Sequence, residues 1–196
     1  MAAARAAWPV DEEAGVGGLA PERLVFLDEC GVPTGMARLY GRSPRGTRAP
    51  GEVPHGPWTR LSVLGALGRE GMLAVMSVQA ATDGAVFHAY LERVLLPALR
   101  ERKPDAVLVV DNLRAHKTPA VRELLDGSGF PYRYLPSYSP DLNPIEPAWA
   151  QVKAELRRVA ARDEDALQRA LGPALDRVSA ENARAYFRHC GYDRPD

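Results

Sequence analysis

Residues 106–149 read AVLVVDNLRAHKTPAVRELLDGSGFPYRYLPSYSPDLNPIEPAW, and this stretch decides how the chain folds. The apolar run at 106–111 is typical of a strand that is buried on both faces. Residues 118–127 predict a helix, because Thr118 can cap its start and a glycine ends it. YRYL at 132–135 predicts a further short strand. Strands that alternate with helices predict an α/β domain whose sheet is at least partly parallel.

The end of this stretch, LPSYSPDLNPIEPAW at 135–149, is rich in proline. Proline fixes φ and removes a backbone donor, so the segment is neither an ordinary helix nor a central strand. A helix-forming run follows, which predicts a stiff loop leading into a helix over residues 146 to about 159. Two interpretations of Glu146 remain open. It could close a capping box with Asn143 as the N-cap, or the loop could aim its carboxylate at a ligand.

The rest of the chain adds elements on both sides. RLVFLD at 23–28 predicts a buried strand, and the runs at 60–67 and 72–78 predict a hairpin. Residues 84–102 have apolar positions at helical spacing. Residues 163–190 predict one or two further helices.

The composition is that of an ordinary soluble globular protein, with 196 residues, 46% of them hydrophobic, and a net charge of zero. This length favours one domain, and no apolar run is long enough to cross a membrane. Residues 1–22 lack periodicity and a secretory signal, so we expect a tail or a linker end there. Cys30 and Cys190 are far apart in the sequence and indicate reduced thiols in a cytoplasmic protein.

Two of the predicted buried strands end in an aspartate, Asp28 and Asp111. Ligands of open α/β sheets bind beyond the carboxyl ends of the strands, so these side chains could face one another there. Taken alone, each aspartate could equally be a turn residue. Together with Glu146 they form a set of three carboxylates, which would repel one another without a cation. Two metal ions in such a set could clamp the attacking and leaving oxygens of a phosphodiester.

At this point the sequence resembles a known family. The segment DNLRAHKTPAVRELL at 111–125, followed by 135–149, is similar to the second half of a DDE transposase, a DDE superfamily endonuclease. The likeness is to the bacterial insertion-sequence branch of the mariner-like superfamily, in which 34 residues typically separate the last two acidic residues, as they do here. FLDECG at 26–31 and RLYGRSPRGTR at 38–48 resemble earlier blocks of the family, and ENARAYFRHCGY at 181–192 resembles its last helix.

The resemblance implies a ribonuclease H-like fold over residues 23–196, with a central mixed sheet of about five strands flanked by helices. Full-length members of the family begin with helix-turn-helix domains, and we expect none here because the resemblance starts near residue 22. It implies that Asp28, Asp111 and Glu146 are catalytic and bind metal, namely two ions of Mg²⁺ or Mn²⁺. The implied activity is cleavage and strand transfer of double-stranded DNA at the element ends and target. The implied partners are a second copy of the chain on DNA and a separately encoded or frameshift-fused helix-turn-helix subunit, in a bacterial cytoplasm.

Further residues are candidates for supporting roles. Asn112, His116 and Asn143 could steady the active site, although a turn residue, a solvated helix start and a helix cap are the alternatives. A positively charged segment and two later helices could contact the DNA backbone, unless they are simply solvated faces. The candidate DNA-binding residues are Arg38, Arg42, Arg45, Arg48, Lys117, Lys153 and Arg157.

Two other functions stay open at this stage. The chain could be an inactive or repurposed transposase remnant that binds DNA or a partner transposase. It could also keep the fold and act as a structure-specific nuclease such as a junction resolvase, although the match around residues 111–149 weighs against this.

Overall fold

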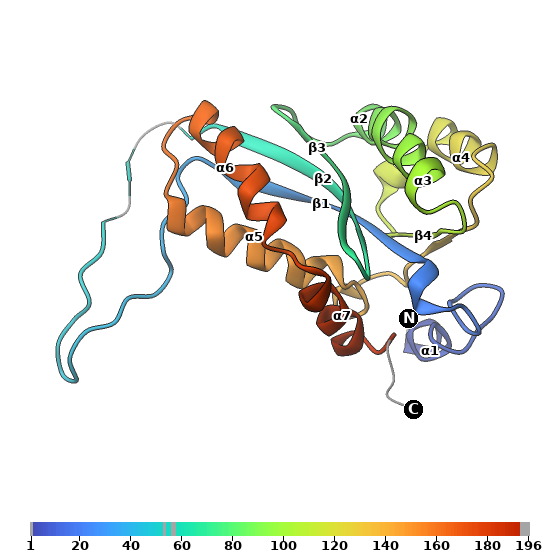
Figure 1. Cartoon of the computed structure of the whole chain (residues 1–196), viewed down its shortest axis with the longest axis horizontal. Coiled ribbons are helices and arrows are strands. Elements are labelled where there is room, and N and C mark those ends of the chain that lie inside the picture. Colours follow the sequence, from blue (N-terminus) through green and yellow to red (C-terminus); the bar gives the residue numbers. More distant parts are fainter. Residues whose placement is uncertain (1, 53, 56–57, 193–196) are drawn as a thin grey trace.

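A computed structural model describes residues 2–52, 54–55 and 58–192. Within these residues, strands form one five-stranded mixed sheet in the order β3-β2-β1-β4-β5 (Figure 1). The β1–β2 and β2–β3 pairs are antiparallel, and β4 is parallel to both β1 and β5. The strands are β1 (Leu24–Pro33), β2 (Arg60–Gly68), β3 (Gly71–Val78), β4 (Val107–Val110) and β5 (Tyr132–Tyr134). The predicted mixed sheet is confirmed.

Helices cover both faces of this sheet (Figure 1). One face is covered by α2, α3 and α4, and the other by α5, α6 and α7. The helices are α1 (Ala2–Ala7), α2 (Gly84–Tyr90), α3 (Leu96–Arg102), α4 (Pro119–Asp126), α5 (Ile145–Val159), α6 (Glu164–Asp176) and α7 (Ala180–His189). A π-helical turn, Leu91–Leu95, joins α2 to α3 just before Pro97, whose missing N–H disturbs regular α-helical bonding.

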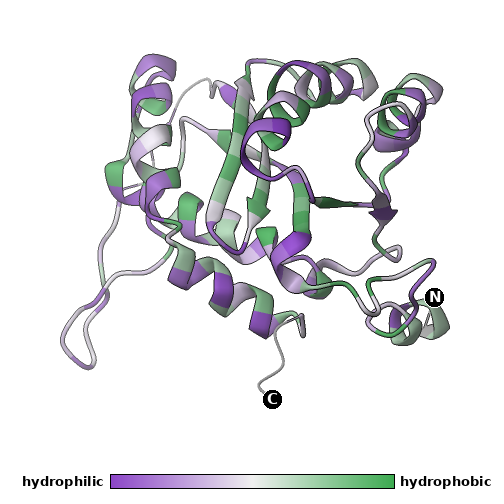
Figure 2. Cartoon of the chain, turned by 45° about the vertical axis from the view of Figure 1, so that its right-hand side comes forward, coloured by the Kyte–Doolittle hydropathy of each residue, from purple (hydrophilic) through white to green (hydrophobic). Residues whose placement is uncertain are grey.

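The strand pattern explains why the central strands are buried on both faces. Successive side chains of a strand point to opposite faces. In β1, Phe26 joins the core under α5, whereas Leu27 joins the core under α2 and α3. In β4, Val109 and Val110 divide in the same way. Figure 2 shows these strands coloured hydrophobic along most of their length, whereas the outer helices alternate between hydrophobic and hydrophilic.

The register of β1 and β4 places the two aspartates together. Phe26 lies opposite Val109 in the parallel pair. Asp28 follows Phe26 by two positions, and Asp111 follows Val109 by two positions. Because strand side chains alternate, both aspartates lie on the same face as Phe26 and Val109. This is the face that α5 covers, so Glu146 in the first turn of α5 approaches the same edge.

Helix α5 is held against the sheet by Trp149, which is 1% exposed. A Cβ atom built on Gly65 of β2 would lie 2.7 Å from the Trp149 ring, so only glycine leaves room for the indole. Trp149 follows Glu146 by three positions along α5, a little less than one helical turn. The packing of the tryptophan therefore sets the position of the helix turn that carries the glutamate.

The N-terminal segment differs from the predicted tail. Trp8 is 3% exposed and belongs to the main core under α5. Its indole Nε1 donates to Tyr192 Oη at 2.8 Å, and Tyr192 Oη donates to the Leu142 carbonyl at 2.5 Å. Arg5 of α1 forms a salt bridge with Asp141 at 2.6 Å. The sequence gives no hint of this docking, because the partners of Arg5 and Trp8 lie more than a hundred residues away.

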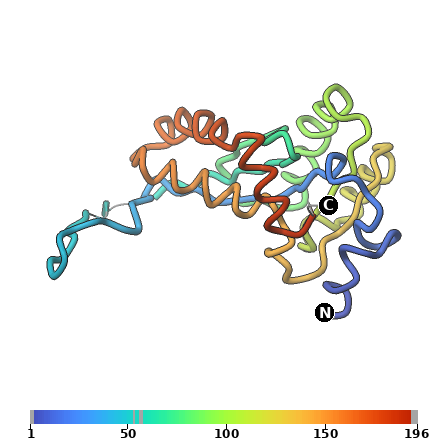
Figure 3. Tube along the Cα trace, turned by 60° about the horizontal axis from the view of Figure 1, so that its bottom comes forward, coloured from blue at the N-terminus to red at the C-terminus, as the bar shows by residue number. Residues whose placement is uncertain are grey.

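The connection between β1 and β2 forms an arm that projects from the body (Figures 1 and 3). Residues 38–52 of the arm are exposed. At its base, Arg162 Nη1 donates to the Met36 carbonyl at 3.0 Å. In the part of the chain described, no helix is long and apolar enough to cross a membrane.

Candidate active site

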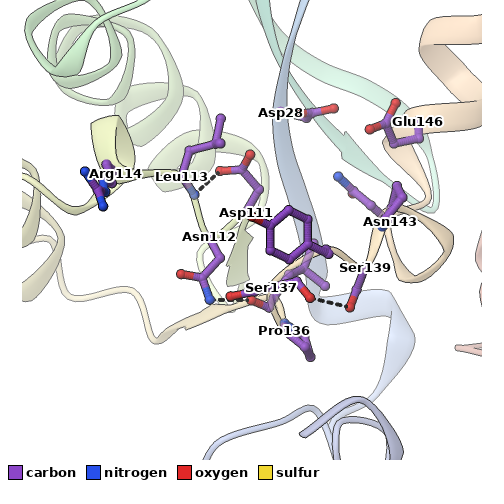
Figure 4. Close-up of a pocket in the computed structure, with 13 residues that line it drawn as sticks. Asp28, Asp111, Asn112, Leu113, Arg114, Pro136, Ser137, Ser139, Asn143 and Glu146 are labelled. Carbon is purple, nitrogen blue, oxygen red and sulfur yellow. Dashed lines mark hydrogen bonds between the residues drawn. The ribbon is translucent and has the colours of Figure 1, made fainter. Parts of the chain in front are cut away.

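A cleft of about 420 Å³ opens beside the middle of β1, the end of β4 and the start of α5. The prediction that the first strand ends at Asp28 is wrong, because β1 continues to Pro33 through its pairing with β2. Its lining includes Asp28, Asp111 and Glu146, which come from three separate elements. Figure 4 shows the Asp28 and Glu146 side chains pointing toward each other, with Asp111 on the adjacent strand end. The proline-rich loop at 135–140 lines the remaining side. The structure thus brings together the three carboxylates that the sequence singles out.

The surroundings of Asp28 destabilise the charged form of its carboxyl group. Asp28 is 9% exposed, and its burial raises its pKa to about 8. The negative charge of Glu146 and, to a smaller extent, that of Asp111 add to this rise, while a backbone hydrogen bond from Glu29 opposes it. A carboxyl group that is buried near two others is destabilised in its charged form. A cation in the cleft would relieve this repulsion.

The raised pKa of Asp28 predicts an unusual pH dependence of stability. The folded chain keeps the Asp28 proton up to about pH 8, whereas the unfolded chain releases it near pH 3.8. Stability should therefore fall as the pH rises between these values. The Asp28→Asn variant should be more stable than the wild type at pH 8 by roughly 2–5 kcal/mol, and the difference should vanish near pH 4. Urea unfolding at several pH values measures this.

The exposed Asp105 provides the matched control for this experiment. The Asp105→Asn variant should not gain stability at pH 8, since Asp105 lies outside the cleft and far less of its side chain is buried. An Asp28→Asn variant that is less stable than the wild type at pH 8 would contradict the electrostatic account.

Asp111 is oriented by a buried histidine. His116 is fully buried, its Nδ1 is hydrogen-bonded to Asp111 Oδ1, and its ring is stacked on Phe87 with centroids 3.8 Å apart. Its Nε2 lies 3.8 Å from Glu29 Oε2. Burial alone lowers the pKa of His116, but the hydrogen bond with Asp111 and the negative charges of Asp111 and Glu29 outweigh it and raise the pKa to about 9. The imidazole is thus cationic at neutral pH and links the two carboxylates, so the solvated alternative for His116 is wrong.

The capping interpretation of Glu146 is also wrong. Helix α5 begins at Ile145 with Pro144 in the cap position, and no side-chain cap is formed among the described residues. The Asn143 amide instead donates to the Pro140 carbonyl at 3.0 Å, which closes the preceding turn. Asn143 is 3% exposed and lines the cleft. Its Oδ1 has no hydrogen-bond partner in the described part of the chain.

Asn112 and Lys117 support each other and the sheet. Asn112 Nδ2 donates to the Leu135 carbonyl at 3.1 Å, which ties the end of β4 to the end of β5. Lys117 Nζ donates to Asn112 Oδ1 and lies 4.6 Å from the centre of the Tyr134 ring. The ammonium group of Lys117 is therefore engaged inside the protein, which argues against the predicted DNA contact.

The other candidate DNA-binding residues are two groups of arginines and Lys153. Arg38 and Arg157 line one groove of about 440 Å³ between the arm and α5, together with Arg158 and Arg162. The exposed arginines of the arm are Arg42, Arg45 and Arg48. Lys153 is half-buried on α5, near enough to Cys30 to lower the pKa of its thiol, although burial dominates and raises that pKa to about 12. Their role in binding DNA stays a prediction.

Sequence reasoning missed several residues of the site. Glu29 directly follows Asp28, and the period of two along β1 could have placed it on the opposite face, near helix α2 and His116. Tyr138 lies at the rim of the cleft, 87% exposed and with a φ of 57°. Arg5 bonds the loop beside it, and nothing in the sequence signals such a distant contact.

The donor set of the cleft suits hard divalent cations. Among the described residues, no three acidic, histidine or cysteine side chains are close enough together to hold a single ion. Mg²⁺ needs only one or two carboxylates, with phosphate and water completing its shell. The repulsion felt by Asp28 and the unpartnered Asn143 Oδ1 are both features that a cation in the cleft would satisfy.

Comparisons with known proteins identify the family of the chain. The model of the family described as DDE superfamily endonuclease matches residues 23–168. No curated protein matches the sequence.

Several solved structures share the fold. The Mos1 mariner paired-end complex with Mn has a TM-score of 0.70 at 17% identity, over 87% of this chain and 53% of that chain. The pre-cleavage Mos1 transpososome has a TM-score of 0.69 at 15% identity, over 88% of this chain and 54% of that chain. A Mos1 transposase catalytic domain with Raltegravir and Mg has a TM-score of 0.64 at 16% identity, over 87% of this chain and 79% of that chain.

The present chain spans about half the length of the first two matched chains. At these identities the likeness shows the fold, which is ribonuclease H-like as the sequence predicts. The family model covers well over half of the chain, and the chain therefore belongs to the DDE superfamily endonucleases.

Proposed function

We propose that the chain is a transposase catalytic domain that cleaves DNA strands and transfers them to a target with the help of Mg²⁺ or Mn²⁺. The observation that carries this proposal is the meeting of Asp28, Asp111 and Glu146 in one cleft. The matched structures support it, because they include Mos1 complexes with a transposon end and with Mg or Mn.

In this proposal Asp28, Asp111 and Glu146 would hold two metal ions in the cleft. When bound, the ions would supply the charge that activates a water or a 3′-hydroxyl and stabilises the leaving oxygen. The residues of the chain supply the geometry. His116 fixes the orientation of Asp111, the packing of Trp149 fixes Glu146, and Asp28 gives up the proton that it holds below about pH 8.

The partners follow from the same proposal. The DNA substrates are the ends of an insertion sequence and its target, in the cytoplasm of a bacterium. The groove of Arg38 and Arg157 and the arginines of the arm offer phosphate contacts outside the cleft. A second copy of the chain and a helix-turn-helix domain, encoded separately or joined by frameshifting, complete the assembly on DNA.

The test is strand cleavage of DNA that carries the ends flanking the gene, by the chain alone and by the chain joined to a helix-turn-helix domain. The wild type should cut with Mg²⁺ or Mn²⁺ and not with EDTA. The Glu146→Gln variant should cut at least roughly 10²–10³-fold more slowly, because a ligand to the ions is lost.

The matched control lies on the same helix. Glu155 pairs with Arg158 and Arg177, away from the cleft, so Glu155→Gln should cut like the wild type. If Glu146→Gln cuts normally, the proposed role of the carboxylates is refuted. If the wild type binds DNA but never cuts, the chain is a remnant that acts by binding.

A further inference from the structure

Two large apolar side chains are exposed at the mouth of the cleft. Tyr138 is 87% exposed and Leu113 is 47% exposed, and both line the same cleft as the three carboxylates. Burial of such side chains stabilises a fold, so their exposure gives the isolated domain no benefit. Apolar groups beside a cleft of acidic residues suit a ligand with a charged part and a flat apolar part.

The backbone at Tyr138 is also strained. Its φ of 57° lies in the left-handed region, which is unfavourable for a residue with a Cβ atom. Strained residues of this kind persist where the surrounding structure enforces them, and they gather at ligand-binding sites. A glycine or asparagine would fit this position with less strain.

Arg5 enforces this conformation from outside the loop. Its Nη1 donates to the Tyr138 carbonyl at 2.9 Å and to Ser139 Oγ at 3.0 Å, and its guanidinium also pairs with Asp141. Ser139 is 6% exposed, so the residue that follows Tyr138 is buried in the protein and fixes the backbone there. These contacts hold the loop and leave the tyrosine ring free in solvent at the edge of the cleft.

We propose that Tyr138, together with Leu113 on the lining of the same cleft, is a platform on which an unpaired DNA base next to the scissile phosphate stacks. This inference rests on the proposed function, because the phosphate must sit among the carboxylates of the same cleft. Aromatic side chains bind single-stranded DNA by stacking on any base, without reading its sequence. Leu113 follows Asp111 by two residues, and its amide donates to Asp111 Oδ1 at 3.3 Å, so a base on the platform neighbours the metal-binding edge.

The test uses a DNA hairpin with a short single-stranded 3′ overhang that carries 2-aminopurine at its first unpaired position. Binding to the full chain should quench the 2-aminopurine fluorescence, since stacking quenches this base. The Tyr138→Gly variant should bind the overhang roughly ten- to a hundredfold more weakly. Tyr138→Phe keeps the ring and should bind within about twofold of the wild type.

The substitution to glycine separates a binding role from a structural one. Glycine relieves the strained φ, so the melting temperature of Tyr138→Gly should be no lower than that of the wild type. Its affinity for the overhang hairpin should nevertheless fall. A blunt hairpin without unpaired bases should bind both proteins alike. If Tyr138→Gly does not fold, Tyr138→Asn, which tolerates the same backbone, replaces it.

Three results would overturn the platform. One is a Tyr138→Gly variant that binds the overhang as tightly as the wild type does. Another is a Tyr138→Gly variant whose affinity falls equally for the overhang hairpin and for the blunt hairpin. The third is an altered self-association with unchanged overhang binding, which would assign the ring to a contact between copies. Because the readout is binding, a failure of strand cleavage by the wild type would count against the proposed function and leave this result intact.

Discussion

The Asp111→Asn variant should lose strand cleavage and stability together. Cleavage should fall by at least roughly 10²–10³-fold, because a proposed metal ligand is removed. Stability should fall as well, because the buried, cationic His116 loses the carboxylate that is hydrogen-bonded to its Nδ1. Breaking a buried ion pair typically costs about 3–5 kcal/mol. Glu29 remains 3.8 Å from the imidazole and partly compensates its charge, so we expect a loss of about 3 kcal/mol, the lower end of that range.

The pH dependence identifies the cause of this loss. The folded pKa of His116 is raised from 6.5 to about 9, so the pairing stabilises the fold fully below pH 6.5 and is lost as the pH rises through 9. Urea unfolding of Asp111→Asn should therefore differ most from the wild type at pH 6 and least above pH 9. Asp28→Asn, the same substitution across the cleft, should change stability in the opposite direction. If both variants change the unfolding free energy in the same direction, the roles given to the two aspartates are refuted.

The Trp149→Ala variant should lose roughly 3–5 kcal/mol of unfolding free energy, the range for truncating a buried large aromatic residue. The indole is 1% exposed, and it fills the space that Gly65 leaves between β2 and α5. A loss of this size is a large part of the total stability of a typical domain. Because α5 carries Glu146, the cavity should also loosen the cleft. Urea unfolding and strand cleavage measured on the same preparation test both effects.

Trp149→Phe is the matched variant. Within the described residues, the indole Nε1 has no hydrogen-bond partner, so phenylalanine removes ring area without breaking a hydrogen bond. It should cost about 1–2 kcal/mol and keep most of the cleavage activity. If Trp149→Ala costs less than about 1 kcal/mol, the helix is positioned by other contacts.

The sequence predicts the sheet and the meeting of the carboxylates for physical reasons that can be named. Doubly buried parallel strands have continuous apolar runs, and the period of two puts Asp28 and Asp111 on one face once the strands are neighbours. The helix at 118–127 is confirmed as α4, with Thr118 Oγ1 accepting from the Val121 amide at 3.4 Å. These features depend on local pattern, which a sequence displays directly.

The features that the sequence does not predict depend on distant contacts. Asn143 and Glu146 have the spacing of a capping box, but Asn143 closes the turn before α5 and its side chain faces the cleft. His116 has the look of a helix-start residue, yet it is buried between Asp111 and Glu29. In each case tertiary packing overrides a sound local interpretation.

The two ends of the chain both hold the loop that leads to Glu146. Trp8 bonds Tyr192, and Tyr192 bonds the Leu142 carbonyl. Neither residue lies within the 23–168 segment that defines the family. A fragment trimmed to that segment would keep Asp28, Asp111 and Glu146, but it would lose the hydrogen bonds that run from Trp8 through Tyr192 to the loop that leads to Glu146. Homology marks where the chemistry is encoded, whereas the flanking residues determine how rigidly it is held.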